Sequence, residues 1–396
     1  MNQFFPPPTI DPFDRLRATD GLLINAERWR SVQEYHRRRQ NFHFQSLHQP
    51  GIVTGLGVKI ITEQSQVPVE YRDGKSVQLQ PGIAIDLLGN PIIVPQAQNV
   101  QIAVEPLPEE PLTVYLVVSY RDPEDLTIKE GQEMVREQFR IDVKTNPPRD
   151  LEVEVCRLLL PPAQQLNLAT PADILLPGYH NLDFRSRQTA TIRAQKSVKI
   201  AQIKHDGPHY DRNFTNLDYL LNSASSLYPQ LQGIEPVGLV SPNAPEIQQY
   251  DLLYLTGDRI DFKIQREIDA LKNYLATGGV LCFDLPPDAS ETIKYIEYFA
   301  EKQCNLALKS LPKRHYLRRQ PFLFAKMPLG GLQQPIQVEV RGGIILAIGD
   351  LAGVWGLDDK LSLTRSTIRA GQEFGINILD FAWNRRTIAK LQGQVD

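Results

Sequence analysis

The sequence predicts an α+β protein of two parts: an N-terminal helix with a mostly antiparallel β domain, then an α/β domain with a mainly parallel sheet. Three observations predict this class. Polar and apolar residues alternate over short runs in the first half, as in half-buried strands. Strand-like and helix-like runs alternate in the second half. The length of 396 residues suits two or three domains at roughly 150 residues each.

Composition excludes several functional classes. Lys and Arg number 43 against 46 Asp and Glu, so the net charge of −3 argues against a protein that mainly coats nucleic acid or an anionic membrane. With 42% hydrophobic and 22% charged residues, the chain does not read as disordered. Three cysteines give no disulfide framework, and the first ten residues lack the pattern of a secretory signal. We therefore expect a cytoplasmic protein.

A basic helix is predicted at residues 25–40. Asn25 is a suitable N-cap, and Trp29, Val32 and His36 recur on one weakly apolar face. A basic, aromatic-bearing surface suits either nucleic acid or an acidic protein. The near-neutral charge of the chain favours a protein, so we expect no nucleic-acid partner. The candidate interface residues are Trp29, Arg30, Arg37, Arg38 and Arg39.

Short strands separated by turn sequences follow this helix. Residues 112–119 form an apolar run, and residues 139–143 and 151–155 alternate cleanly. The N-terminal domain is therefore assigned to residues 1–160. Residues 161–195 show neither helical nor strand periodicity and are predicted to be an extended connector.

Part of this domain resembles a known module. The residues that carry the resemblance are DGLL at 20–23, Tyr35, His36, Arg37, His48, GIVTGLGV at 51–58, PGIAID at 81–86 and Gly89. This pattern resembles the N-terminal module of proteins from phage-tail-like contractile injection systems. In many relatives a His-Gly pair leads directly into the Gly-Ile-Val segment, whereas His48, Gln49 and Pro50 intervene here. The resemblance implies an assembly module whose partners are other subunits of a symmetric, multi-copy particle. Its glycines suit tight turns and need no catalytic chemistry.

The domain at residues 196–396 alternates strands and helices. The predicted strands are residues 198–203, 237–240, 252–255, 280–283, 336–340 and 344–348. The predicted helices are one that starts at a Thr215 capping box, then 261–277, 290–303 and 366–384. This order predicts a mainly parallel sheet with helices on both faces.

A second resemblance lies in this half. YLTG at 254–257, GGVLCFD at 278–284, ILAIGD at 345–350 and GINI at 375–378 resemble bacterial domains of unknown function whose fold is similar to class I glutamine amidotransferases. The resemblance implies a flavodoxin- or amidotransferase-like fold. Asp284 stands where such enzymes carry the nucleophilic cysteine, and the prolines that follow it supply no N–H for an oxyanion hole. Cys282 lies inside the strand, so we expect no catalytic residues and no cofactor.

One polar cluster leaves an alternative open. His205, Asp206, His209 and Asp211 follow the first strand of this domain and could hold a metal, but Pro208 prevents a helix that would align the histidines. A polar loop explains the same residues, and we expect no metal. The function expected from the sequence is a non-enzymatic structural subunit of a contractile injection particle, at its baseplate, cap or anchor, with membrane association only through partners. The alternative is a degenerate or altered hydrolase or ligand-binding domain that uses the His205, Asp211 and Asp284 region.

Overall fold

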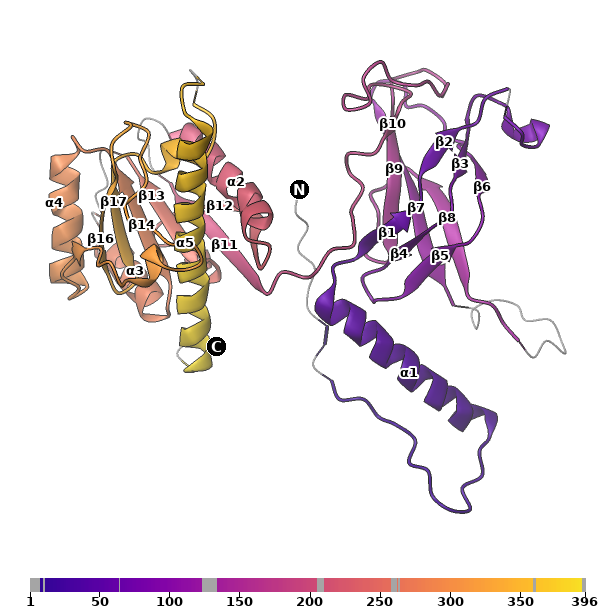
Figure 1. The fold of residues 1–396 in the computed structure, drawn as a ribbon, viewed down its shortest axis with the longest axis horizontal. Helices are drawn as coiled ribbons and strands as arrows, with labels where there is room; N and C mark the ends of the chain where they lie inside the picture. The colour runs from indigo at the N-terminus through magenta and orange to yellow at the C-terminus, as the bar shows by residue number, and fades with distance from the viewer. Residues whose placement is uncertain are drawn as a thin grey trace. The chain divides into compact units, whose positions relative to one another are not determined.

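The computed structural model describes residues 8–9, 11–63, 65–122, 134–204, 210–257, 262, 264–358 and 361–393, without the side chains of residues 210–213. The chain divides into two compact units that meet between Arg193 and Ala194, which we call the N-terminal and C-terminal units. Both contain helix and strand, so the protein is mixed α and β (Figure 1). Among the described residues, no helix has the length and apolarity needed to cross a bilayer.

Antiparallel strands build the N-terminal unit. Its elements are α1 (Ala26–Leu47), β1 (Gly51–Gly55), β2 (Val58–Ile60), β3 (Ser76–Leu79), β4 (Gly82–Ile85), β5 (Pro91–Val94), β6 (Gln98–Gln101), β7 (Leu112–Arg121), β8 (Gln138–Lys144), β9 (Glu152–Leu160) and β10 (Leu182–Asp183). They form three sheets, with strand orders β1-β4-β5, β2-β3-β6 and β10-β9-β7-β8. Each of these strand pairs is antiparallel. One apolar core joins the sheets, because buried residues of β3, β5, β7 and β9 belong to a single cluster.

The segment predicted as a connector, residues 161–195, folds almost entirely with this unit. Leu166, Leu168 and Leu182 are buried in its core, and residues up to Arg193 belong to it. The Arg187 guanidinium donates hydrogen bonds to the carbonyl oxygens of Leu56 (2.6 Å) and Val155 (3.2 Å). The segment is therefore part of the N-terminal unit. It lacks sequence periodicity because irregular backbone, not a helix or a long strand, delivers its apolar side chains.

A mainly parallel sheet forms the centre of the C-terminal unit. Its strands are β11 (Lys196–Ile203), β12 (Leu231–Val240), β13 (Leu252–Thr256), β14 (Val280–Leu285), β15 (Lys309–Ser310), β16 (Gln337–Arg341) and β17 (Ile344–Ile348). The strand order is β12-β11-β13-β14-β17-β16-β15. The first five strands in this order run parallel, and β16 and β15 add an antiparallel edge.

Helices cover both faces of this sheet, as Figure 1 shows. The helices are α2 (Tyr210–Leu227), α3 (Gln265–Ala276), α4 (Ser290–Tyr298) and α5 (Arg365–Leu391). Buried residues of α2 and α5 pack with Tyr254 and Cys282, whereas those of α3 and α4 pack with Leu253 and Phe283. Successive strand residues thus point to opposite faces of the sheet, and both faces are apolar because helices cover both.

Several boundaries differ from those predicted: α5, for example, continues to Leu391, seven residues beyond its predicted end, and the starts of α2 and β12 also differ. Helix α2 begins at Tyr210, so Thr215 lies inside the helix and is not its cap. Strand β12 begins at Leu231, six residues before the predicted start at Val237. Gly233 and Pro236 made this first half unlike a strand, but β12 is the edge of the sheet, where a proline breaks no pairing on its open side.

Candidate functional site

The carboxyl ends of the central strands bring Asp284 and Asp350 together. Asp284 is the next-to-last residue of β14, and Asp350 follows β17. Strands β14 and β17 are parallel neighbours in the sheet. Open α/β sheets usually bind ligands at this edge. The sequence placed Asp284 at the end of a strand, and the structure places it there.

The carboxylate of Asp284 is engaged by the protein itself. Its side chain is 3% exposed and accepts hydrogen bonds from the Tyr254 hydroxyl (2.5 Å) and from the backbone N–H groups of Leu351 (2.9 Å) and Ala352 (2.8 Å). Ala352 begins a short 3₁₀ helix, Ala352–Val354, whose first N–H groups need such an acceptor. Asp284, a residue of β14, therefore caps the short helix that follows the neighbouring strand β17.

Burial, and after it the negative charge of Asp350, raise the pKa of Asp284 to about 6, although the three hydrogen bonds oppose the shift. Asp350 has a left-handed backbone conformation, with φ of 59°, which an aspartate tolerates better than most residues. A raised pKa at a sheet edge can mark a functional carboxyl, but structural networks perturb pKa values in the same way. Here all three hydrogen-bond donors to Asp284 are groups of the chain itself, as in a structural network.

The cysteines are in environments that suppress thiolate chemistry. Cys282 is fully buried on the α5 side of the sheet, and burial raises the pKa of its thiol well above the ordinary value. Cys304 is half-buried and burial raises its pKa to about 11. Because the thiolate is the nucleophile, neither is suited to acyl transfer at neutral pH.

Most of the predicted polar loop lies outside the described residues. His205, Asp206 and His209 lie outside the described residues, and the side chain of Asp211 is also outside them. Across the part of the chain that the structure describes, no three His, Cys, Asp or Glu side chains form a group that could hold a metal ion.

The basic helix α1 is longer and more exposed than the sequence predicts. Asn25 is its N-cap, as predicted, and accepts a hydrogen bond from the Arg28 N–H (2.9 Å), but the helix continues to Leu47. None of its described residues is buried, and Trp29 is 56% exposed. Of the predicted apolar face, Trp29 and His36 are exposed and Val32 is half-buried.

Polar contacts hold α1 against the N-terminal unit instead. Asn41 donates a hydrogen bond to the Asn90 side chain (2.6 Å), and Gln45 donates to the Leu88 carbonyl. Gly89 has a φ of 82°, and a Cβ there would lie 2.4 Å from the Asn41 carbonyl oxygen. The glycine shared with the injection-system pattern thus permits close approach of a turn to α1.

The five candidate interface residues differ in their surroundings. Arg37 forms ion pairs with Glu34 (2.6 Å) and with Asp122. Arg38 lies over the Phe13 ring and Arg39 over the Tyr35 ring, at 5.8 Å in both cases. The segment before α1 folds back along it, as Figure 1 and these ring contacts show. Trp29 and Arg30 lie nearer the start of the helix and are exposed.

The sequence interpretation missed a polar network on α5. Asp380 is buried and paired with the Lys196 ammonium (2.6 Å), and it accepts a hydrogen bond from the Tyr316 hydroxyl (2.5 Å). Asn384 donates to the Tyr316 oxygen (2.7 Å). A single acidic residue within the apolar run INILDFAW was the available signal, but its partners are distant in sequence.

One comparison with known families gives a match. Residues 199–383 match a family model described as a domain of unknown function, DUF4159. The match begins in β11 and ends in α5, so it spans the central sheet of the C-terminal unit. A search of curated proteins finds no match to the chain.

Proposed function

We propose that this chain is a non-enzymatic structural subunit of a phage-tail-like contractile injection particle, and that α1 is the element with which it docks on other subunits. In this proposal the C-terminal unit has the flavodoxin- or amidotransferase-like fold and serves as a binding scaffold. The protein would act in the cytoplasm as part of a large particle.

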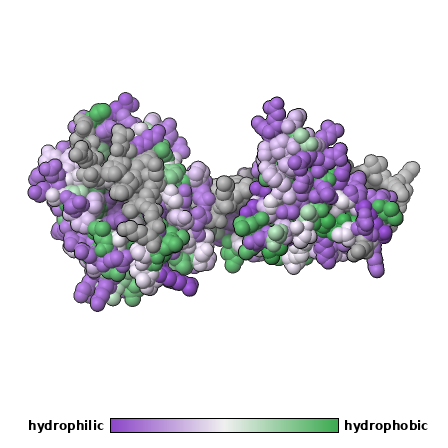
Figure 2. Space-filling model, turned by 90° about the horizontal axis from the view of Figure 1, so that it is seen from above, coloured by the Kyte–Doolittle hydropathy of each residue, from purple (hydrophilic) through white to green (hydrophobic). Residues whose placement is uncertain are grey.

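The observation that carries the proposal is the exposure of α1. A 22-residue helix normally gains most of its stability from burying an apolar face, yet α1 buries none of its residues within the chain. Scattered exposed apolar residues are ordinary, and on the face drawn in Figure 2 they lie in small groups among hydrophilic ones. Leu23 and Ile24, just before α1, and Trp29 in its first turn are 78%, 56% and 56% exposed. Exposed apolar residues near arginines in the sequence are typical of an interface.

The environment of Asp284 supports a role without catalysis. Its oxygens already accept three hydrogen bonds from the protein, and Cys282 is sequestered in the core. The resemblance of residues 20–89 to an assembly module supports the same role.

The test is incorporation into particles. Trp29→Ser should leave the isolated protein folded by circular dichroism, because the side chain is largely exposed, but should reduce the amount of the chain in sedimented particles at least about tenfold. Leu175→Ser is the matched control, since Leu175 is 71% exposed in the same unit but outside α1. Equal incorporation of both variants and the wild type would reject α1 as the docking element.

Arginine variants of α1 test the charge of the partner surface. Arg37→Glu would break contacts with Glu34 and Asp122 inside the unit, so it does not test docking alone. Arg38→Glu together with Arg39→Glu keeps those ion pairs and should also reduce incorporation, by charge repulsion at an acidic partner surface. Undiminished incorporation of this double variant would exclude an acidic partner surface.

A further inference from the structure

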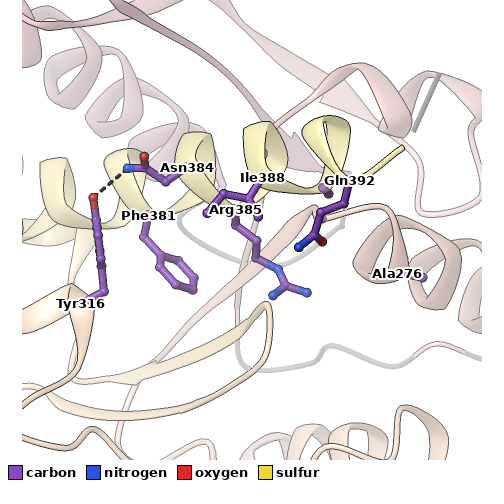
Figure 3. Close-up of a pocket in the computed structure, with 9 residues that line it drawn as sticks. Ala276, Tyr316, Phe381, Asn384, Arg385, Ile388 and Gln392 are labelled. Carbon is purple, nitrogen blue, oxygen red and sulfur yellow. Dashed lines mark hydrogen bonds between the residues drawn. The ribbon is translucent and has the colours of Figure 1, made fainter. Parts of the chain in front are cut away.

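A cavity lies at the end of the C-terminal unit where the parallel strands begin, opposite the edge that carries Asp284. It has a volume of about 300 Å³, within the range of small-molecule sites. It lies between the end of α3, the glycine turn before β14, and the last turns of α5 (Figure 3). The lining residues that matter for recognition are Tyr316, Phe381, Asn384, Arg385, Ile388 and Gln392.

Among the residues that the structure describes, Arg385 is the only charged one in the lining. Its guanidinium donates hydrogen bonds to the backbone carbonyls of Leu275 (3.1 Å) and Gly279 (3.4 Å), which fix its position but carry no negative charge. Burial lowers the pKa of Arg385, as expected for a cation that is partly removed from water without a carboxylate partner. The described part of the cavity wall thus carries a net positive charge.

The neighbouring carboxylate does not neutralise this cation. Asp380 is paired with Lys196 at 2.6 Å and accepts hydrogen bonds from the Tyr316 hydroxyl and the Asn384 amide. The same network orients Tyr316 and Asn384 at the rim of the cavity, where Figure 3 shows them joined by a hydrogen bond. A ligand would therefore meet a fixed polar rim.

Apart from Gln392, the remaining wall is apolar. Phe381 and Arg385 project from α5 toward the same side in Figure 3, and Ile388 and Ala389 occupy the next turn. A ligand with one negative group and a short hydrocarbon body would match both parts of this surface.

We propose that this cavity binds a small amphiphilic carboxylate, with the carboxylate on the Arg385 guanidinium and the hydrocarbon on Phe381 and Ile388. The site is separate from α1 and does not depend on the assembly role. Arginine suits the task because its planar fork can bind a carboxylate through two parallel hydrogen bonds.

Calorimetric titration of the full chain with octanoate tests the proposal, with octanamide as the neutral analogue of equal length. Octanoate should bind with one site per chain, and octanamide at least about tenfold more weakly, because it cannot form the charge-assisted hydrogen bonds. Equal affinity for the two compounds, or no octanoate binding at millimolar concentration, would overturn the proposal.

Two variants locate the site. Arg385→Met should weaken octanoate at least about tenfold, while Arg369→Met on the same helix, whose partner Glu373 lies outside the cavity, should not. Arg385→Met also loses two backbone contacts, so Ile388→Trp provides a second variant. Ile388 is 53% exposed, and the larger ring should fill the cavity and block octanoate without unfolding the chain. Octanoate binding that survives in Ile388→Trp places the ligand elsewhere and contradicts the proposal.

Discussion

Replacement of Asp284 by Asn should change how the stability of the C-terminal unit depends on pH. With a pKa of about 6 in the folded state and 3.8 as its ordinary value, the carboxyl binds more protons in the native state than in the unfolded state between these values. Unfolding free energy therefore falls as pH rises through this window, and the penalty persists above pH 6. A shift of about two pKa units corresponds to about 3 kcal/mol.

The variant lacks this titration. Relative to Asp284→Asn, the wild type should lose about 2 kcal/mol between pH 4.5 and pH 7.5, because part of the penalty is already present at pH 4.5. The amide also fails to accept one of the two backbone hydrogen bonds, but that loss is the same at both pH values.

Urea unfolding at the two pH values measures the difference. In a Trp29→Phe background, both remaining tryptophans, Trp355 and Trp383, lie in the C-terminal unit, so their fluorescence reports on that unit. Carboxyl groups that do not interact with Asp284 titrate equally in the two proteins and cancel in the comparison. A stability difference that stays constant, or that moves in favour of the wild type as pH rises, would refute the assignment of a raised pKa to Asp284.

Three further variants have defined outcomes. Asp350→Asn should lower the pKa of Asp284, because it removes a nearby negative charge. Asparagine also tolerates the left-handed backbone at this position. Carbon NMR of the Asp284 carboxyl would detect the shift, and an unchanged pKa would contradict the prediction. Gly89→Ala should lower the free energy of unfolding by about 1–3 kcal/mol, since the φ of Gly89 is 82° and the added Cβ would meet the Asn41 carbonyl. Faster amide exchange in α1 would show the weakened contact, and unchanged exchange would argue against it. Cys282→Ala should lower the free energy of unfolding by only about 1 kcal/mol, through lost packing, and should leave function unchanged. Disappearance of a hydrolase or glutaminase activity in this variant would instead establish an enzyme.

The alternation of the C-terminal unit could be predicted because its central strands are short, apolar and buried on both faces. The apolar runs predict strands at residues 252–255 and 280–283, and β13 and β14 lie there. The start of β12 was missed because Pro236 is unfavourable in a central strand but tolerated at the edge, and edge position is a property of the assembled sheet.

The sites were less predictable. Asp284 could be located at a strand end, but its donors Leu351 and Ala352 lie more than sixty residues away in the sequence. The cavity around Arg385 joins α3, α5 and the Tyr316 turn, which no local pattern relates. The length of α1 was underestimated because its last turns are held by polar contacts with residues 88–90, not by an apolar face.

The central claim is that this chain is a structural subunit of a contractile injection particle. Electron microscopy of particles purified gently from cells that contain this chain, combined with mass spectrometry of their subunits, tests it most directly. The account predicts that the chain is present in a fixed ratio to the other subunits and that density for α1 lies against a neighbouring subunit. Particles that assemble without the chain, while it sediments as a free protein, would contradict it.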